Sequence, residues 1–272
     1  MKSAITVCLV KEAAAGPFVF HTDLAEGCAQ AAKLGFDAVE VFPPTAKAVN
    51  KAQLKTLLKK HRLQLAAVGT GAGWLRQKLS LTSADRSVRA RATAFIRSIV
   101  DLAAEFQAPA IIGSMQGKSE GPVGRAEALD YLAAGLEKLS GRAASHGTTL
   151  LYEPLNRYET NLFNQVPATA TWLAERGLSN VRILADLFHM NIEEPDLAAA
   201  LRAAGSAVGH IHFADSNRRA IGMGHTKIKS IMQALKAIRY GGYLSAEIFP
   251  APNADEAARQ TMLSFRQATG SA

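Results

Sequence analysis

The chain has 272 residues, with 31 lysines and arginines against 23 aspartates and glutamates, so its formal net charge is +8. Hydrophobic residues make up 48% and charged residues 20%, which is typical of a globular protein and excludes a largely disordered chain. No apolar run approaches the roughly 18 residues that a membrane span requires. The basic side chains are spread over predicted helices and form no dense block interleaved with aromatics, which argues against nucleic-acid binding.

The N-terminal apolar run, ITVCLV over residues 5–10, follows Lys2 in the manner of a signal peptide. The run is short, and Lys11 and Glu12 interrupt it, so we interpret it as a buried first strand. The two cysteines, Cys8 and Cys28, lie in apolar segments and offer no disulfide framework. These features predict a cytoplasmic protein.

Further along the chain, short apolar runs alternate with longer amphipathic segments whose apolar residues recur at helical spacing. The predicted strands cover residues 5–10, 38–42, 64–69, 108–113, 148–154, 181–186, 208–214 and 242–249. The predicted helices cover residues 23–35, 51–61, 84–106, 127–147, 168–177, 196–205, 228–239 and 256–268. Strands that are apolar on both faces and separated by helices indicate a parallel sheet. Eight such units predict an α/β fold, a single (β/α)8 TIM-barrel domain over residues 1–272. A doubly wound sheet is the alternative, but no phosphate-binding glycine loop follows the first strand.

Polar side chains stand near the ends of the last four predicted strands, where the catalytic residues of such barrels lie. In chain order they are Glu153, Asp186, His212 and Glu247. A carboxylate buried in an apolar strand is costly unless it is paired or ligated, so we predict that these four side chains bind one divalent metal. Three carboxylates and one imidazole suit Mn²⁺, Mg²⁺ or Co²⁺ better than a tetrahedral structural zinc.

Several segments carry a family resemblance. EPLNRYE, ADLFHMNIEE, HIHFADSNRR with a following GMGH, and AEIF resemble signature segments of the ketose 3-epimerase group of the xylose-isomerase-like barrel superfamily. In the first half, GTGAGWLRQKLSLTSAD and IIGSMQGKSEG are similar to the 5-keto-L-gluconate epimerase branch. The resemblance implies a metal site, usually occupied by manganese, at Glu153, Asp186, His212 and Glu247. It also implies a homo-oligomer, either a dimer or a tetramer.

The same resemblance assigns roles around the metal. Glu153 and Glu247 would be the catalytic acid/base pair, and the substrate oxygens would be held by Glu159, His189 and Arg218. The chemistry favours this arrangement independently, because epimerisation beside a carbonyl needs a proton acceptor on each face of one carbon. The enediolate between the two proton transfers is stabilised by a divalent ion and by hydrogen-bond donors. By contrast, we expect Arg157 and Arg219 to be solvated or to cap helices.

The loops after the first four strands determine which sugar fits. Gly69, Gly71 and Gly73 lack the spacing of a dinucleotide fingerprint, and we interpret them as a loop that lets the backbone approach the sugar. The side chains expected either to line the pocket or to pack in the core are Phe18, Phe20, Trp74 and Met115. If the substrate is a keto-sugar acid, its carboxylate would pair with Lys118 or Arg125.

The sequence therefore predicts a metal-dependent isomerase that epimerises a small ketose or keto-sugar acid. A hydroxypyruvate isomerase or an inosose dehydratase remains an alternative, and so does a metal-free sugar-binding protein. An apurinic endonuclease shares this type of barrel and would explain the positive charge. It would also need three metals and further histidines from earlier strands, and the chain has no histidine between Arg62 and Ser145.

Overall fold

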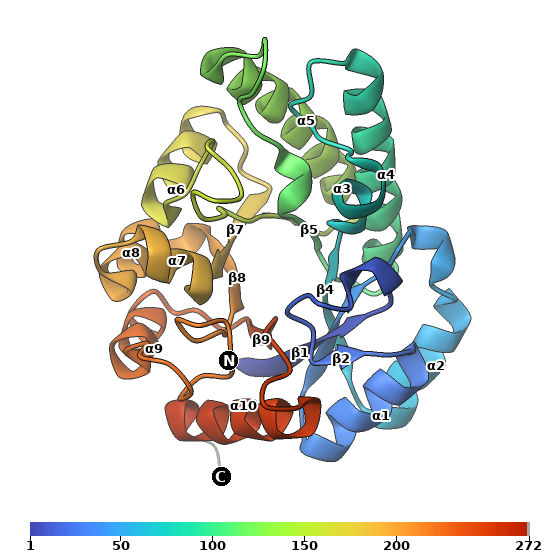
Figure 1. The fold of residues 1–272 in the computed structure, drawn as a ribbon, viewed down its shortest axis with the longest axis vertical. Coiled ribbons are helices and arrows are strands. Elements are labelled where there is room, and N and C mark those ends of the chain that lie inside the picture. Colours follow the sequence, from blue (N-terminus) through green and yellow to red (C-terminus); the bar gives the residue numbers. More distant parts are fainter. Residues whose placement is uncertain (271–272) are drawn as a thin grey trace.

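The computed structural model describes residues 1–270 and shows a closed parallel barrel surrounded by helices (Figure 1). Strands pair in the order β2-β1-β3-β4-β5-β6-β7-β8-β9, and pairing of β1 with β9 closes the ring. The barrel strands are β1 (Lys2–Cys8), β3 (Ala38–Phe42), β4 (Gln64–Gly69), β5 (Ala110–Ile112), β6 (Leu150–Tyr152), β7 (Val181–Asp186), β8 (Val208–His212) and β9 (Tyr243–Ala246). The two-residue strand β2 (Phe20–His21) pairs with the end of β1. The predicted TIM barrel is confirmed.

Within residues 1–270, eight helices pack around the barrel, and each corresponds to a predicted amphipathic segment. They are α1 (Leu24–Leu34), α2 (Lys51–His61), α4 (Arg86–Ala104), α5 (Arg125–Ser145), α6 (Val166–Glu175), α8 (Leu197–Ala204), α9 (Ile228–Ala237) and α10 (Ala254–Thr269). Local chemistry sets their ends: Asp23 caps the start of α1 by accepting from the Glu26 amide, and Gly35 ends it at a φ of 87°. No helix among residues 1–270 is long and apolar enough to cross a membrane.

Two short helices were not predicted, α3 (Ala72–Gln77) and α7 (Leu187–Glu193), and four 3-10 turns also occur: η1 (Lys11–Ala13), η2 (Ala46–Ala48), η3 (Ser114–Gln116) and η4 (Gly205–Ala207). The glycine-rich segment that we interpreted as a loop is helical from Ala72 onward, so that interpretation is wrong there. A Cβ on Gly73 would lie 2.5 Å from Met115 Sδ, and one on Gly69 would lie 2.6 Å from the Phe42 ring. These glycines therefore permit close packing of α3 and β4 against neighbouring side chains.

The inside of the barrel holds a small apolar cluster below the polar ends of the strands. Its members come from four consecutive strands: Ala67, Ile111, Leu151 and Leu184. Because side chains two positions apart share a strand face, Leu151 points to the same side as Glu153, and Leu184 to the same side as Asp186. The apolar layer therefore forms a base under the polar side chains at the strand ends.

Candidate active site

Four predicted side chains meet at the carboxyl ends of β6 to β9. Glu153 directly follows β6, Asp186 and His212 end β7 and β8, and Glu247 directly follows β9. His212 Nδ1 lies 3.5 Å from both Glu153 Oε1 and Asp186 Oδ2. The same nitrogen lies 3.8 Å from Glu247 Oε2. One donor atom from each of the four side chains fits within a span of 4.8 Å, so they can share one cation.

The donor atoms at the centre of this group are suited to a metal. Glu153 Oε1, Asp186 Oδ2 and His212 Nδ1 are buried and have no hydrogen-bond partner within the protein. Leaving such atoms buried and unsatisfied costs free energy, which coordination to a cation would remove. Three oxygen donors and one imidazole nitrogen match the preference of Mn²⁺ or Mg²⁺ for mostly oxygen ligands. The residues therefore fit a divalent metal.

Burial and mutual repulsion shape the charges of these carboxyl groups. Burial raises the pKa of Glu153, the charges of Glu247 and Asp186 add to the rise, and His212 offsets it only in part. Burial likewise raises the pKa of Glu247 despite the opposing effects of His212 and Arg218. Asp186 differs, because its positive neighbours outweigh its burial and lower its pKa. The site thus has an excess of negative charge that a divalent cation would balance.

Beneath His212 lies a carboxylate that the sequence analysis did not single out. Glu40 on β3 is 2% exposed, and its Oε1 lies 3.3 Å from His212 Nε2, the ring nitrogen that faces away from the other carboxylates. His210 Nε2 contacts Glu40 Oε2 at 2.9 Å, and the Thr6 hydroxyl donates to Glu40 Oε1 at 3.2 Å. Burial opposes ionisation of Glu40, but the two histidines outweigh it and lower its pKa. Glu40 is therefore an ionised partner that orients His212 with Nδ1 toward Glu153 and Asp186.

The Glu40→Gln variant should bind metal about 10- to 100-fold more weakly than the wild type, because carboxylate partners of ligating histidines fix ring orientation and basicity. Competition with a chelator of known affinity measures the change. The control is Asp37→Asn immediately before β3, where the carboxylate accepts from Ser3 away from the site. Equal metal affinity of Glu40→Gln and the wild type would contradict this role.

His189 on α7 faces the same group of carboxylates. Its Nδ1 accepts from the backbone amide of Asn156 at 3.3 Å, which leaves the ring proton on Nε2. Nε2 lies 3.6 Å from Asp186 Oδ2 and has no hydrogen-bond partner. Burial lowers the pKa of His189 to about 4, although Asp186 acts in the opposite direction. His189 therefore offers a neutral N–H donor toward the pocket, and Asn156 is a second residue that the sequence analysis missed.

The other predicted side chains have different surroundings. Arg218 Nη2 donates to Glu247 Oε2 at 2.7 Å and lies 3.8 Å from Asp186 Oδ2. Glu159 lines the pocket, and burial raises its pKa although Arg218 opposes the shift. Arg157 binds Glu193 at the surface and takes no part in the pocket. Thus Arg218 and Glu159 lie in the site together with His189.

A single carboxylate organises the loop that carries Arg218. Asp215 accepts hydrogen bonds from the backbone amides of Ser216, Gly222, Gly224 and Thr226, at 2.7 to 2.9 Å. Arg218 itself has a φ of 58°, a strained value for a residue with a side chain. Burial opposes ionisation of Asp215, but these amides outweigh it and lower its pKa. The loop conformation at Arg218 therefore depends on an ionised Asp215.

Replacing Asp215 with Asn should lower the free energy of unfolding at pH 7 by about 1–3 kcal/mol, because buried amides lose a charged acceptor. Folding lowers the pKa of Asp215, so the ionised carboxylate stabilises the fold fully at any pH above the unfolded-state pKa of about 3.9. This stabilisation is lost as the pH falls through the lower pKa that Asp215 has in the folded protein. Denaturant unfolding of both proteins between pH 6 and pH 3 measures it. A stability difference that does not narrow on acidification would contradict the assignment.

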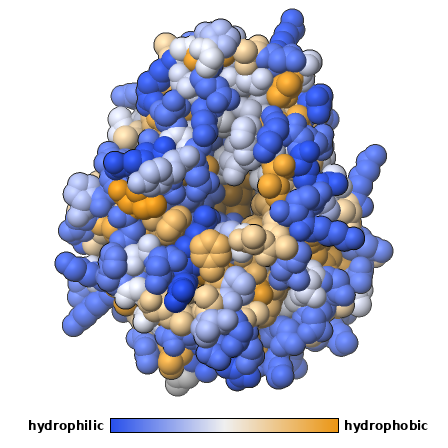
Figure 2. All heavy atoms as spheres, in the orientation of Figure 1, coloured by the Kyte–Doolittle hydropathy of each residue, from blue (hydrophilic) through white to orange (hydrophobic). Residues whose placement is uncertain are grey.

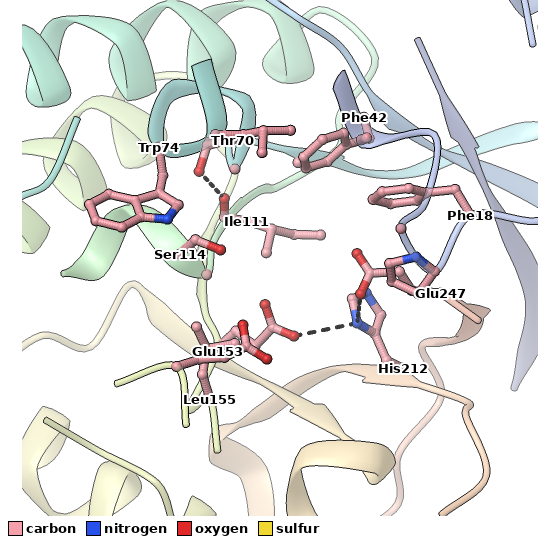
Figure 3. A pocket seen from close by; sticks show the side chains of 18 of the residues that line it. Phe18, Phe42, Thr70, Trp74, Ile111, Ser114, Glu153, Leu155, His212 and Glu247 are labelled. Carbon is pink, nitrogen blue, oxygen red and sulfur yellow. Dashed lines mark hydrogen bonds and ion pairs between the residues drawn. The ribbon is translucent and has the colours of Figure 1, made fainter. Parts of the chain in front are cut away.

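A cavity of about 310 Å³ opens above these side chains at the same end of the barrel. Figure 2 shows a hollow in this face that is bordered by apolar groups, whereas the surrounding surface is mostly hydrophilic. Phe18 and Phe42 stack with ring centroids 4.9 Å apart and form one wall, and Trp74 lies on the other side (Figure 3). Phe20 and Met115 are buried in the core and do not line this cavity. The site is therefore a polar floor under an apolar mouth.

The two cationic side chains proposed for a carboxylated substrate lie outside this cavity. Lys118 lines a smaller adjacent cavity, and Arg125 donates to the backbone carbonyls of Asn161 and Leu162. Arg218 is the basic residue among the lining of the main cavity, and it is paired with Glu247. The main cavity thus offers no free cation for a substrate carboxylate among the described residues.

Comparison with known proteins identifies the family of this chain. Residues 28–268 match the family described as xylose isomerase-like TIM barrel. The chain belongs to this family. It is 33% identical to the D-psicose 3-epimerase of Agrobacterium fabrum over 224 residues, which cover 80% of this chain and 76% of that protein. It is 30% identical to the L-ribulose 3-epimerase of a Methylomonas strain over 242 residues, covering 88% and 82% of the two chains.

Within the family, the crystal structure of D-allulose 3-epimerase from Methylomonas in complex with D-allulose superposes with a TM-score of 0.82 at 25% identity. The match covers 98% of this chain and 97% of that one. These relatives are named epimerases, which are isomerases. The family expected from the segments around Glu153, Asp186, His212 and Glu247 is therefore confirmed, whereas the likeness to the 5-keto-gluconate branch stays a prediction.

Proposed function

We propose that this protein is a divalent-metal-dependent ketose 3-epimerase, which inverts the carbon next to the substrate carbonyl. The observation that carries the proposal is the placement of two carboxylates in one pocket, the buried Glu153 and the largely buried Glu247. Both line one pocket, and Figure 3 shows Glu153 across the pocket from Glu247, which lies beside His212. Inversion of a carbon needs one proton acceptor and one proton donor on opposite faces, and this pair supplies both.

The residues that would hold the metal are Glu153, Asp186, His212 and Glu247, with Mn²⁺ as the first candidate and Co²⁺ or Mg²⁺ as alternatives. Such a cation supplies Lewis-acid stabilisation of the negative charge that develops on the substrate oxygens when the C–H bond is broken. Asp186 differs from the two glutamates in having a lowered pKa. It therefore serves only as a ligand and stays ionised throughout the reaction.

The proton transfers fall to the two glutamates. In one direction a carboxylate oxygen of Glu153 removes the proton from the substrate carbon, and the carboxyl group of Glu247 returns a proton to the opposite face. In the reverse direction the roles exchange. Burial raises the pKa of both carboxyl groups, and a bound cation would act in the opposite direction by favouring their ionised forms.

Two donors in the pocket would stabilise the enediolate. His189 Nε2–H is unpaired and directed toward the carboxylate cluster, and the Arg218 guanidinium lies beside Glu247. A neutral imidazole donor and a fixed guanidinium stabilise developing oxyanion charge without moving, which makes them effective in a buried site. Glu159 at the pocket edge would accept hydrogen bonds from substrate hydroxyls.

The proposal is tested by incubating the protein and Mn²⁺ with D-fructose, D-psicose, D-tagatose, L-ribulose, 5-keto-gluconate and hydroxypyruvate, and separating the products by chromatography. We expect inversion at C3 of at least one ketose, with solvent deuterium at that carbon in D₂O, and loss of turnover in EDTA. Turnover of hydroxypyruvate alone would replace the proposal by a hydroxypyruvate isomerase. Purified protein without stoichiometric divalent metal and without any turnover would indicate a sugar-binding protein.

A further inference from the structure

A second cavity of about 210 Å³ adjoins the main one and is not used by the reaction described above. Both cavities are lined by Trp74, Ser114, Leu155 and Glu159, so they are continuous across these side chains. We call the second space the outer cavity, and its own lining includes Lys118 and Tyr158. A ketose bound over the carboxylates would have the outer cavity beside it.

The walls of the outer cavity are fixed by hydrogen bonds between two loops. The loop after β5 and the loop after β6 are joined by Ser119 and Asn161, which exchange two hydrogen bonds of 2.9 Å. The Thr160 hydroxyl also donates to the Gly117 carbonyl at 2.8 Å. Gly117 has a φ of 87°, and any Cβ there would meet the Ser80 and Thr82 hydroxyl groups. The cavity is therefore preformed, which reduces the entropic cost of binding.

The outer cavity combines aromatic and hydrogen-bonding groups. Tyr158 is 78% exposed, which leaves most of its amphipathic ring open to contact with a ligand. The Lys78 ammonium group lies over the Trp74 ring, with Nζ 5.0 Å from the ring centroid. Lys118, Glu120 and Glu159 add charged groups of both signs. Sugar rings present apolar C–H faces and a rim of hydroxyls, and this set of groups can contact both.

The charges of the outer cavity favour a neutral occupant. Among the described residues that line the outer cavity, Lys118 carries an ammonium group and Glu120 and Glu159 carry carboxyl groups, whereas Lys78 lies over Trp74 outside the lining. A carboxylate or phosphate on the substrate would meet repulsion from the two acids, whereas uncharged hydroxyls can bond to either sign. The outer cavity is thus better matched to a sugar ring than to an acidic group.

We propose that the outer cavity binds a second, neutral sugar ring attached to the ketose, so that the substrate of this protein is a glycosylated ketose. This inference rests on the proposed epimerase function, which places the reacting ketose in the main cavity. Trp74 and Ser114 then lie where the two sugar units join, and Tyr158 contacts the distal ring.

The test compares D-fructose with 1-O- and 6-O-glucosyl-fructose as substrates of the Mn²⁺-loaded protein. We expect at least one disaccharide to be epimerised at the ketose unit with a kcat/KM at least tenfold above that of D-fructose. If the free ketoses are inverted but neither disaccharide is, the outer cavity does not bind a second ring, and the proposed function stands without it. If neither D-fructose nor a disaccharide is inverted, the proposed epimerase function fails. The calorimetric measurements described next then test separately whether the outer cavity binds a second sugar ring.

Calorimetry with the same sugars measures binding without turnover. We expect the better disaccharide to bind at least tenfold more tightly than D-fructose, and Tyr158→Ala to remove most of this advantage. Leu263→Ala on α10 is the matched control, because Leu263 is also exposed but lies outside both cavities. Equal affinities for disaccharide and fructose, or an advantage that survives in Tyr158→Ala, would overturn the inference.

Discussion

Replacing either Glu153 or Glu247 with Gln should lower kcat by about 100-fold or more, because an amide can neither accept the substrate proton nor return one. The two variants should differ in which epimer they fail to deprotonate. Each retains the other glutamate, so proton exchange on one face of the substrate carbon can continue in a protein that still binds metal. Deuterium incorporation without inversion is therefore the expected signature of a variant that has lost one of the two acid/base groups.

The measurement follows kcat at saturating Mn²⁺ together with metal content, because an amide is also a weaker ligand than a carboxylate. Glu193→Gln is the matched control: Glu193 is a largely buried glutamate that binds Arg157 outside the pocket. Single-turnover reactions in D₂O then follow the label on the substrate carbon. The single-turnover reaction also shows whether the abstracted proton is shielded from exchange with solvent. If it is not shielded and the wild-type product still carries no solvent deuterium, the two-base mechanism is wrong, and a retro-aldol or hydride route must replace it.

The fold could be predicted because its signals are local and repeated. Each barrel strand is a short apolar run, and each of the eight outer helices is long enough to show a helical period of apolar residues. The helices α3 and α7 have only six and seven residues, which is too short for such a period to appear. The α3 segment also contains Gly73, which the sequence alone assigns to a loop. In the structure a glycine is needed there because a Cβ would collide with the Met115 side chain.

The candidate site could be predicted only in part. A parallel barrel brings all strand ends to one edge, so Glu153, Asp186, His212 and Glu247 could be grouped from their places on consecutive strands. Glu40 escaped notice because it lies within the second predicted strand, and its contact with His210 joins residues 170 positions apart. One signal was present, since Glu40 is the single charged residue in the apolar run AVEVF, and a lone buried charge requires a partner.

Replacing Asp186 or His212 should abolish tight metal binding and activity together. Both side chains are fully buried, and each presents an unpaired donor atom to the centre of the cluster. A cation held by fewer protein ligands is released more readily into water, so Asp186→Ala and His212→Ala should be isolated without stoichiometric metal. The wild type should gain thermal stability on addition of Mn²⁺, since a ligand that binds only the folded state stabilises it, and these variants should not.

The obvious difficulty is that Asp186 also caps α7, where its side chain accepts from the Phe188 amide at 2.8 Å. Asp186→Asn separates the two roles, because asparagine is as good a helix cap as aspartate but lacks the charge that holds a divalent cation. We expect Asp186→Asn to fold with near wild-type stability in EDTA and to show no stabilisation by Mn²⁺. Asp196→Asn, which changes the cap of α8 away from the site, should respond to Mn²⁺ as the wild type does. One tightly bound Mn²⁺ retained by Asp186→Asn or His212→Ala would show that the cation is bound by a different set of side chains.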